Sequence, residues 1–97
     1  MRYSLHPEAE DDLREAAGFY REQAGNVLSQ SLFAEFEISV DVLLRHPGLG
    51  VIWRFGKRRY VMKLFPYSLI YTFSGDEIRI LAVAHHSRRP GYWRRRK

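Results

Sequence analysis

The last thirteen residues, His85 to Lys97, hold two histidines, one tyrosine and six arginine or lysine residues. Imidazole and phenol groups can move protons, and cations can hold phosphate groups. His85, Arg88 and Tyr92 are therefore the candidate catalytic residues if the protein cleaves RNA. The alternative is that His85 ends a strand with its hydrogen bonds satisfied and that residues 94–97 fray. No third ligand lies near the two histidines at a suitable spacing, so we expect no metal site.

A second group of cations lies on the first two strands of the predicted meander and consists of Arg54, Lys57, Arg58, Arg59 and Lys63. Hairpin geometry could bring it next to the C-terminal cations, and the joint surface could bind phosphates or an acidic protein segment. The alternative is protection of sheet edges, where Lys and Arg discourage aggregation. With two residues of the C-terminal segment added, the candidate contacts for a target or partner protein are Arg54, Arg58, Arg59, Lys63, Arg89 and Trp93.

Charge divides the chain into two unlike halves. Residues 1–50 carry four arginines against nine acids, a net charge of −5, whereas residues 51–97 carry twelve cations against two acids, a net charge of +10. The basic half predicts an acidic partner, either nucleic acid or an acidic protein segment. The acids that crowd the start of the first predicted helix, from Glu8 to Glu15, are explained by the helix dipole and by solvation.

Several classes of function are excluded by what the chain lacks. It has no cysteine, so a disulfide framework, a cysteine nucleophile and a cysteine-ligated metal are excluded. Its seven glycines are dispersed and form no phosphate loop, and no cofactor is expected. No apolar run approaches the ~20 residues of a membrane span, and acids follow the N-terminus at once. We therefore expect a cytoplasmic protein that does not bind membranes.

The elements that must position these residues follow from periodicity. Apolar residues at helical spacing predict one helix from Pro7 to Ala24 and a second that ends at His46, with a break at Gly25-Asn26. A short strand precedes them, and strands are predicted at 51–55, 59–65, 67–73 and 78–84. The last of these is apolar on both faces, which predicts a central position in the sheet.

These elements indicate an α+β fold: an N-terminal strand, an antiparallel helical hairpin and a four-stranded antiparallel meander. The length of 97 residues fits a single domain over the whole chain, with a basic C-terminal tail at 85–97. That tail is too charged for the core, although Tyr92 and Trp93 could pin its middle to the sheet.

Three blocks of this sequence resemble the RelE/ParE toxin family of type II toxin–antitoxin systems. They are the N-terminal strand with residues 6–13 and Tyr20, the segment 65–71, and the segment 83–93. The resemblance implies two helices packed on a small curved sheet. It also implies a cognate antitoxin with an amphipathic helix and an acidic segment, and therefore a hetero-oligomer with that antitoxin.

The same resemblance offers two mechanisms. The RelE-like branch cleaves messenger RNA on the ribosome, and Lys63, Arg88 and Tyr92 could match parts of its pattern. The ParE-like branch inhibits DNA gyrase. Ser68 stands where the nuclease branch has an arginine, and the ending Arg-Pro-Gly-Tyr-Trp is more similar to the ParE-like branch. The resemblance therefore favours a toxin that binds gyrase, with the RNA-cleaving enzyme as the alternative.

Overall fold

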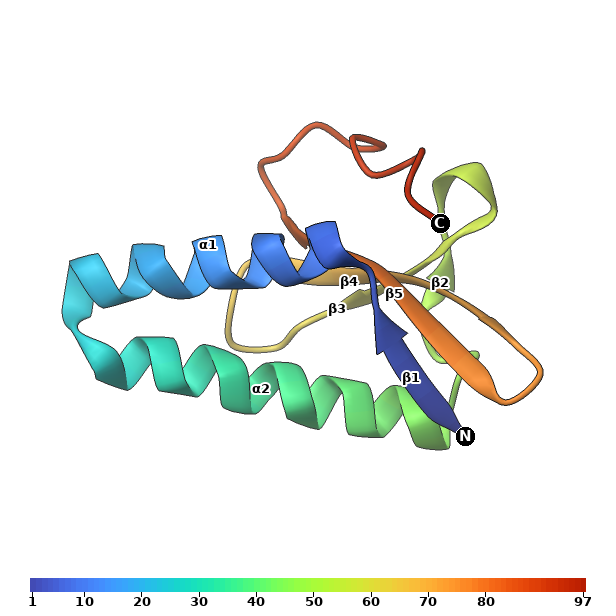
Figure 1. Ribbon diagram of the computed structural model, residues 1–97, viewed down its shortest axis with the longest axis horizontal. Helices are drawn as coiled ribbons and strands as arrows, with labels where there is room; N and C mark the ends of the chain where they lie inside the picture. Colours follow the sequence, from blue (N-terminus) through green and yellow to red (C-terminus); the bar gives the residue numbers. More distant parts are fainter.

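Two helices pack side by side against a five-stranded sheet in the computed structural model, which describes residues 1–97 (Figure 1). The chain runs through β1 (Arg2–Leu5), α1 (Pro7–Ala24), α2 (Asn26–Arg45), β2 (Val51–Ile52), the short 3₁₀ helix η1 (Arg54–Gly56), β3 (Arg58–Val61), β4 (Tyr67–Ser74) and β5 (Glu77–His85). The α+β class, the helical hairpin and the meander are confirmed. Neither helix is long and apolar enough to cross a membrane.

Local signals set the helix ends as predicted. His6 caps α1, because its Nδ1 accepts a hydrogen bond of 3.0 Å from the Glu8 N–H, and Pro7 occupies the first turn. Gly25 joins the two helices with a φ of 75°, in the left-handed region that glycine adopts without strain. The second helix ends at Arg45, two residues before Pro47.

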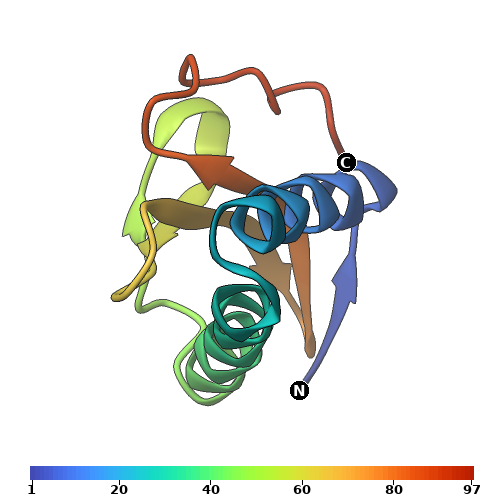
Figure 2. The same cartoon turned by 90° about the vertical axis from the view of Figure 1, so that its left-hand side faces the viewer.

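The strand order in the sheet is β1-β5-β4-β3-β2. Strand β5 lies between β4, with which it is antiparallel, and β1, with which it is parallel. The predicted central position of this strand is confirmed. Its two apolar faces are both covered: the helices pack on one face, and the C-terminal segment, residues 86–97, crosses the other (Figure 2).

Two predicted strands are shorter than expected. The strand predicted at 51–55 ends at Ile52, because η1 turns the chain and Phe55 adopts a φ of 60°. The strand predicted at 59–65 ends at Val61. There the carboxylate of Glu35 on α2 accepts backbone N–H bonds from Lys63 at 2.6 Å and from Leu64 at 3.0 Å, which draws the β3–β4 loop towards the helix.

Candidate functional site

The C-terminal segment is folded against the sheet, which corrects the expectation that Trp93 is a surface contact residue. Its indole is 1% exposed and packs with Ile70, Ala82 and Ala84. These residues lie on the sheet face that the helices leave uncovered, so burial of the indole removes that apolar surface from water. Trp93 is therefore unavailable to a partner while the segment stays in place.

Arg96 fastens the end of this segment to α1. Its Nη1 lies 2.6 Å from Oδ2 of Asp12 and donates to the Leu81 carbonyl at 3.0 Å, and its Nε lies 2.9 Å from the Glu8 carboxylate. The Arg96 and Asp12 side chains are each 11% exposed. The alternative of a frayed end does not hold for residue 96. The expectation that Asp12 is a solvated carboxylate that only complements the helix dipole is corrected.

Tyr92 is engaged by the same carboxylate. Its hydroxyl donates to Asp12 Oδ2 at 3.2 Å, and the guanidinium of Arg88 lies 3.9 Å from the centre of its ring. Burial, followed by the nearby charge of Asp12, raises the pKa of Tyr92 to about 12. A phenol with such a pKa is a poor general base near neutral pH, because almost none of it is ionised.

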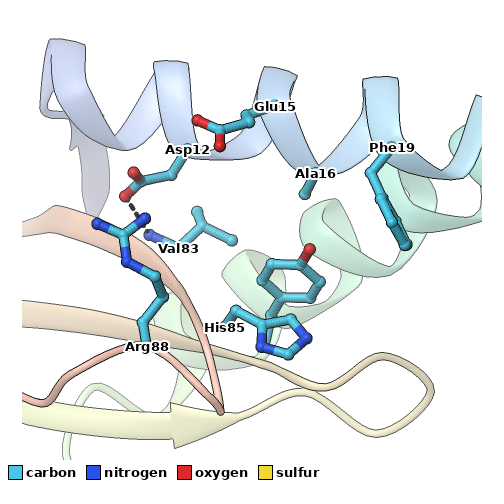
Figure 3. Close-up of a pocket in the computed structure, with 8 residues that line it drawn as sticks. Asp12, Glu15, Ala16, Phe19, Val83, His85 and Arg88 are labelled. Carbon is cyan, nitrogen blue, oxygen red and sulfur yellow. Dashed lines mark hydrogen bonds between the residues drawn. The ribbon is translucent and has the colours of Figure 1, made fainter.

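His85 and Arg88 meet at a cavity of about 180 Å³ between α1 and the end of β5 (Figure 3). Glu15 lines the same cavity from α1. Nδ1 of His85 accepts from the backbone N–H of Ser87 at 3.0 Å and lies 2.7 Å from its hydroxyl. Asp12 lines the cavity as well, so the cavity holds an imidazole, a guanidinium and two carboxylates, a set that could move one proton. Tyr92, predicted as the third catalytic group, does not line this cavity, although its hydroxyl donates to Asp12.

Ser68 links two other predicted groups on the opposite sheet face. Its Oγ accepts from Nε of Arg59 at 3.0 Å and lies 3.0 Å from Nε2 of His86. The guanidinium of Arg59 also lies 4.7 Å from the centre of the Trp53 ring. Desolvation and the charge of Arg59 lower the pKa of His86. The serine that stands in place of an expected cation therefore holds a neighbouring cation by hydrogen bonding, beside a cleft of about 150 Å³.

The remaining predicted contact residues have separate surroundings. Arg58 donates to the carbonyls of Gly48 and Gly50 at 3.2 and 2.8 Å and so holds the loop before β2. Lys63 lies at an apolar groove beside α2. Arg54 and Arg89 line one large cleft. The second cation group therefore meets the C-terminal cations as expected, Arg59 with Arg88 at one cleft and Arg54 with Arg89 at another. Arg58 and Lys63 line neither cleft, so the predicted cations do not all share one site.

The sheet and the helix pair leave an apolar groove of the kind that receives an amphipathic helix, and Lys63 is the one lining residue that the sequence analysis named. The groove has a volume of about 440 Å³ between α2 and the β3–β4 region. Ile38 is 63% exposed and Leu64 79% exposed at this groove. Ala34, Ile38 and Val42 follow each other at a spacing of four, a second apolar stripe beside the one that faces the core. This second stripe is the feature of the sequence from which the groove residues on α2 could have been predicted.

Comparisons with known proteins agree with this architecture. Residues 3–90 match the profile of a family described as the ParE toxin of the type II toxin–antitoxin system parDE. A solved structure entitled "Chromosomal ParDE TA system from P. aeruginosa" superposes with a TM-score of 0.78. The two sequences are 22% identical over 88% of this chain and 95% of that one, so the likeness is one of fold. No curated protein matches the sequence.

Proposed function

The chain belongs to the ParE toxin family of type II toxin–antitoxin systems, and we propose that it inhibits growth by binding an essential target, DNA gyrase. The family match over residues 3–90 carries this proposal. A cognate antitoxin neutralises the toxin by occupying its surface.

The surroundings of Tyr92 and Ser68 support a toxin that acts by binding its target and not by cleaving RNA. The Tyr92 hydroxyl donates to Asp12, and its pKa of about 12 is far above neutral. Ser68 replaces a cation that could stabilise charge on a phosphate, an interaction that typically contributes several kcal/mol to catalysis. The ribosome-dependent cleavage of messenger RNA is the alternative that these observations disfavour.

The apolar groove beside α2 is the proposed seat of the antitoxin helix. An amphipathic helix binds by laying its apolar face into such a groove, and Ile38 and Leu64 offer exposed apolar surface there. Lys63, whose side chain borders the same groove, can pair with an acidic residue of the antitoxin. This arrangement suits a partner that is both amphipathic and acidic.

The target is tested with purified toxin in a gyrase supercoiling assay. Supercoiling should fall as toxin is added, and induction in cells should bring filamentation with intact messages. Full supercoiling at high toxin concentration overturns the gyrase proposal, and rapid cleavage of messages within codons would establish the alternative.

The groove is tested with a charge placed in it. Ile38→Glu should leave the toxin active but prevent its rescue by co-expressed antitoxin. Val27→Glu is the matched control, because Val27 lies on the same helix, is 73% exposed and does not line the groove. Equal rescue of both variants contradicts the assignment of the groove.

A further inference from the structure

Four arginines surround one cleft of about 660 Å³ between η1 and the C-terminal segment. Arg54 comes from η1, whereas Arg89, Arg94 and Arg95 come from the segment that crosses the sheet. Of the nuclease candidates, Tyr92 also lines this cleft, whereas His85 and Arg88 do not. The cleft shares no lining residue with the cavity between α1 and β5 or with the groove beside α2, and it is therefore distinct from both.

The charges in this arginine cleft have no acidic partner within the protein. The five ion pairs of the chain are made by Arg2, Arg14, Arg45 and Arg96, the last of which makes two. All four cleft arginines are exposed. Four like charges around one concavity repel one another, so the cleft is a site of attraction for a polyanion from outside.

Phe55 places an aromatic ring in the same cleft at a conformational cost. It is the one non-glycine residue with a positive φ, 60°, a region that disfavours bulky side chains. The ring is nevertheless 54% exposed. It stands edge-on to the buried Trp93 ring, with centroids 6.0 Å apart, and the Arg94 guanidinium lies 5.8 Å from its centre.

The backbone at Gly91 packs closely against the Phe55 ring. This glycine has a φ of 87°, and a Cβ at its position would lie 2.8 Å from Cε2 of Phe55. The Phe55 ring therefore rests against a backbone position without a side chain and is supported from behind by Trp93. The result is a half-exposed aromatic ring beside the Arg94 guanidinium, in a cleft lined by three further arginines.

We propose that the arginine cleft binds single-stranded nucleic acid, with phosphates on the arginines and a base stacked on Phe55. Unpaired bases stack on aromatic rings and guanidinium planes, whereas a duplex keeps its base faces covered. No α-helix lines the cleft to enter a major groove. A peptide of acidic residues, such as polyglutamate, would use the charges but carries no aromatic ring to stack on Phe55. The proposal goes beyond gyrase inhibition and does not depend on it.

The first experiment measures binding by fluorescence anisotropy with labelled oligothymidylate of about 12 nucleotides, within the usual range of site sizes. Oligouridylate of equal length separates RNA from DNA, and binding of either supports the proposal. The single strand should bind more tightly than a duplex of the same length or a polyglutamate peptide. Equal or tighter binding of the duplex or of polyglutamate overturns it.

Substitutions separate this cleft from the general effect of positive charge. Arg94→Gln with Arg95→Gln should weaken binding by about tenfold or more and lower the salt slope by about 0.7 for each phosphate that is no longer neutralised. Arg2→Gln with Arg21→Gln removes the same charge from exposed positions outside the cleft and should change affinity by less than about twofold. Equal decreases in affinity in the two double variants refute the site.

The ring is tested with Phe55→Asn, since asparagine tolerates a positive φ. Affinity should fall by about fivefold to a hundredfold with the salt slope unchanged, because the stacking interaction is removed while the arginines still hold the phosphates. The emission of the buried Trp93, measured with Trp53 replaced by phenylalanine, reports whether the segment remains folded. Unchanged affinity in the folded variant contradicts the role of the ring.

Discussion

The ion pair between Asp12 and Arg96 should be the main polar anchor of the C-terminal segment. Oδ2 of Asp12 lies 2.6 Å from Nη1 of Arg96 and also accepts the Val83 N–H at 3.1 Å and the Tyr92 hydroxyl at 3.2 Å. The test is a double-mutant cycle with Asp12→Asn, Arg96→Gln and the combined variant. Each single change removes one charge and leaves the other buried.

The expected magnitude follows from burial. Breaking a buried pair on one side typically costs about 3–5 kcal/mol, because the remaining charge is uncompensated. Asparagine keeps an oxygen that can accept the Val83 N–H, and Arg96 keeps its ion pair with the exposed Glu8, so Asp12→Asn belongs at the lower end, about 3 kcal/mol. A chain of this length has a total stability of about 5–15 kcal/mol. The combined variant should be destabilised by about 2 kcal/mol less than the sum of the two single variants.

The assay is urea unfolding followed by Trp93 fluorescence and by far-ultraviolet circular dichroism, with Trp53→Phe as the common background so that Trp93 is the only tryptophan. A fluorescence transition that precedes the dichroism transition in the single variants would show that the segment is released before the fold is lost. The matched control is the exposed pair Asp41 and Arg45, with N and O atoms 3.0 Å apart on α2. Its coupling should be about 0.3–0.5 kcal/mol. A coupling for the buried pair no larger than that of this control would refute the reasoning.

Three further predictions follow from single contacts. The pKa of Tyr92 is raised from 10.0 to about 12, so the protonated phenol contributes roughly 2–3 kcal/mol to the free energy of unfolding below pH 10, and this contribution is lost between pH 10 and 12. Tyr92→Phe should therefore flatten the decrease in stability over that pH range, and an unchanged slope contradicts this. Gly50→Ala should destabilise the fold by about 1–3 kcal/mol in thermal unfolding, because its Cβ would lie 2.6 Å from the Tyr71 hydroxyl oxygen; a wild-type melting temperature would be inconsistent with that clash. Glu35→Ala leaves two N–H groups of the β3–β4 loop without their acceptor and should cost about 2–4 kcal/mol in urea unfolding, whereas a destabilisation below about 0.5 kcal/mol would mean that water replaces the carboxylate.

The helices and the meander were predictable because their signals are local. Apolar spacing, the cap at His6 and the break at Gly25 act within a few residues of where they stand. The premature end of β3 was not predictable, since it depends on Glu35, which lies 28 residues from the Lys63 N–H that it accepts. The sequence signal of a continuing strand was overridden by a tertiary hydrogen bond.

The candidate sites divide in the same way. The sequence indicated that the C-terminal half is basic and that Arg54 and Arg89 are contact candidates, and these remain predictions. It suggested that Trp93 could pin the segment to the sheet, but it could not indicate that the indole is fully buried, because the uncovered sheet face that receives it exists only once the strands have paired. It also gave no reason to connect Phe55 with Gly91, which are 36 positions apart and fit together only in the folded chain.

The sequence by itself determined the order and type of the elements, the division of charge between the halves and the resemblance to a toxin family, because each is written in composition or in short-range spacing. Only the tertiary structure decided which charges are neutralised. Arg96 meets Asp12 across 84 positions, while Arg94 and Arg95 beside it stay exposed around a cleft. The physical reason is that ion pairing and burial depend on distance through space, which the strand order and the path of the C-terminal segment set.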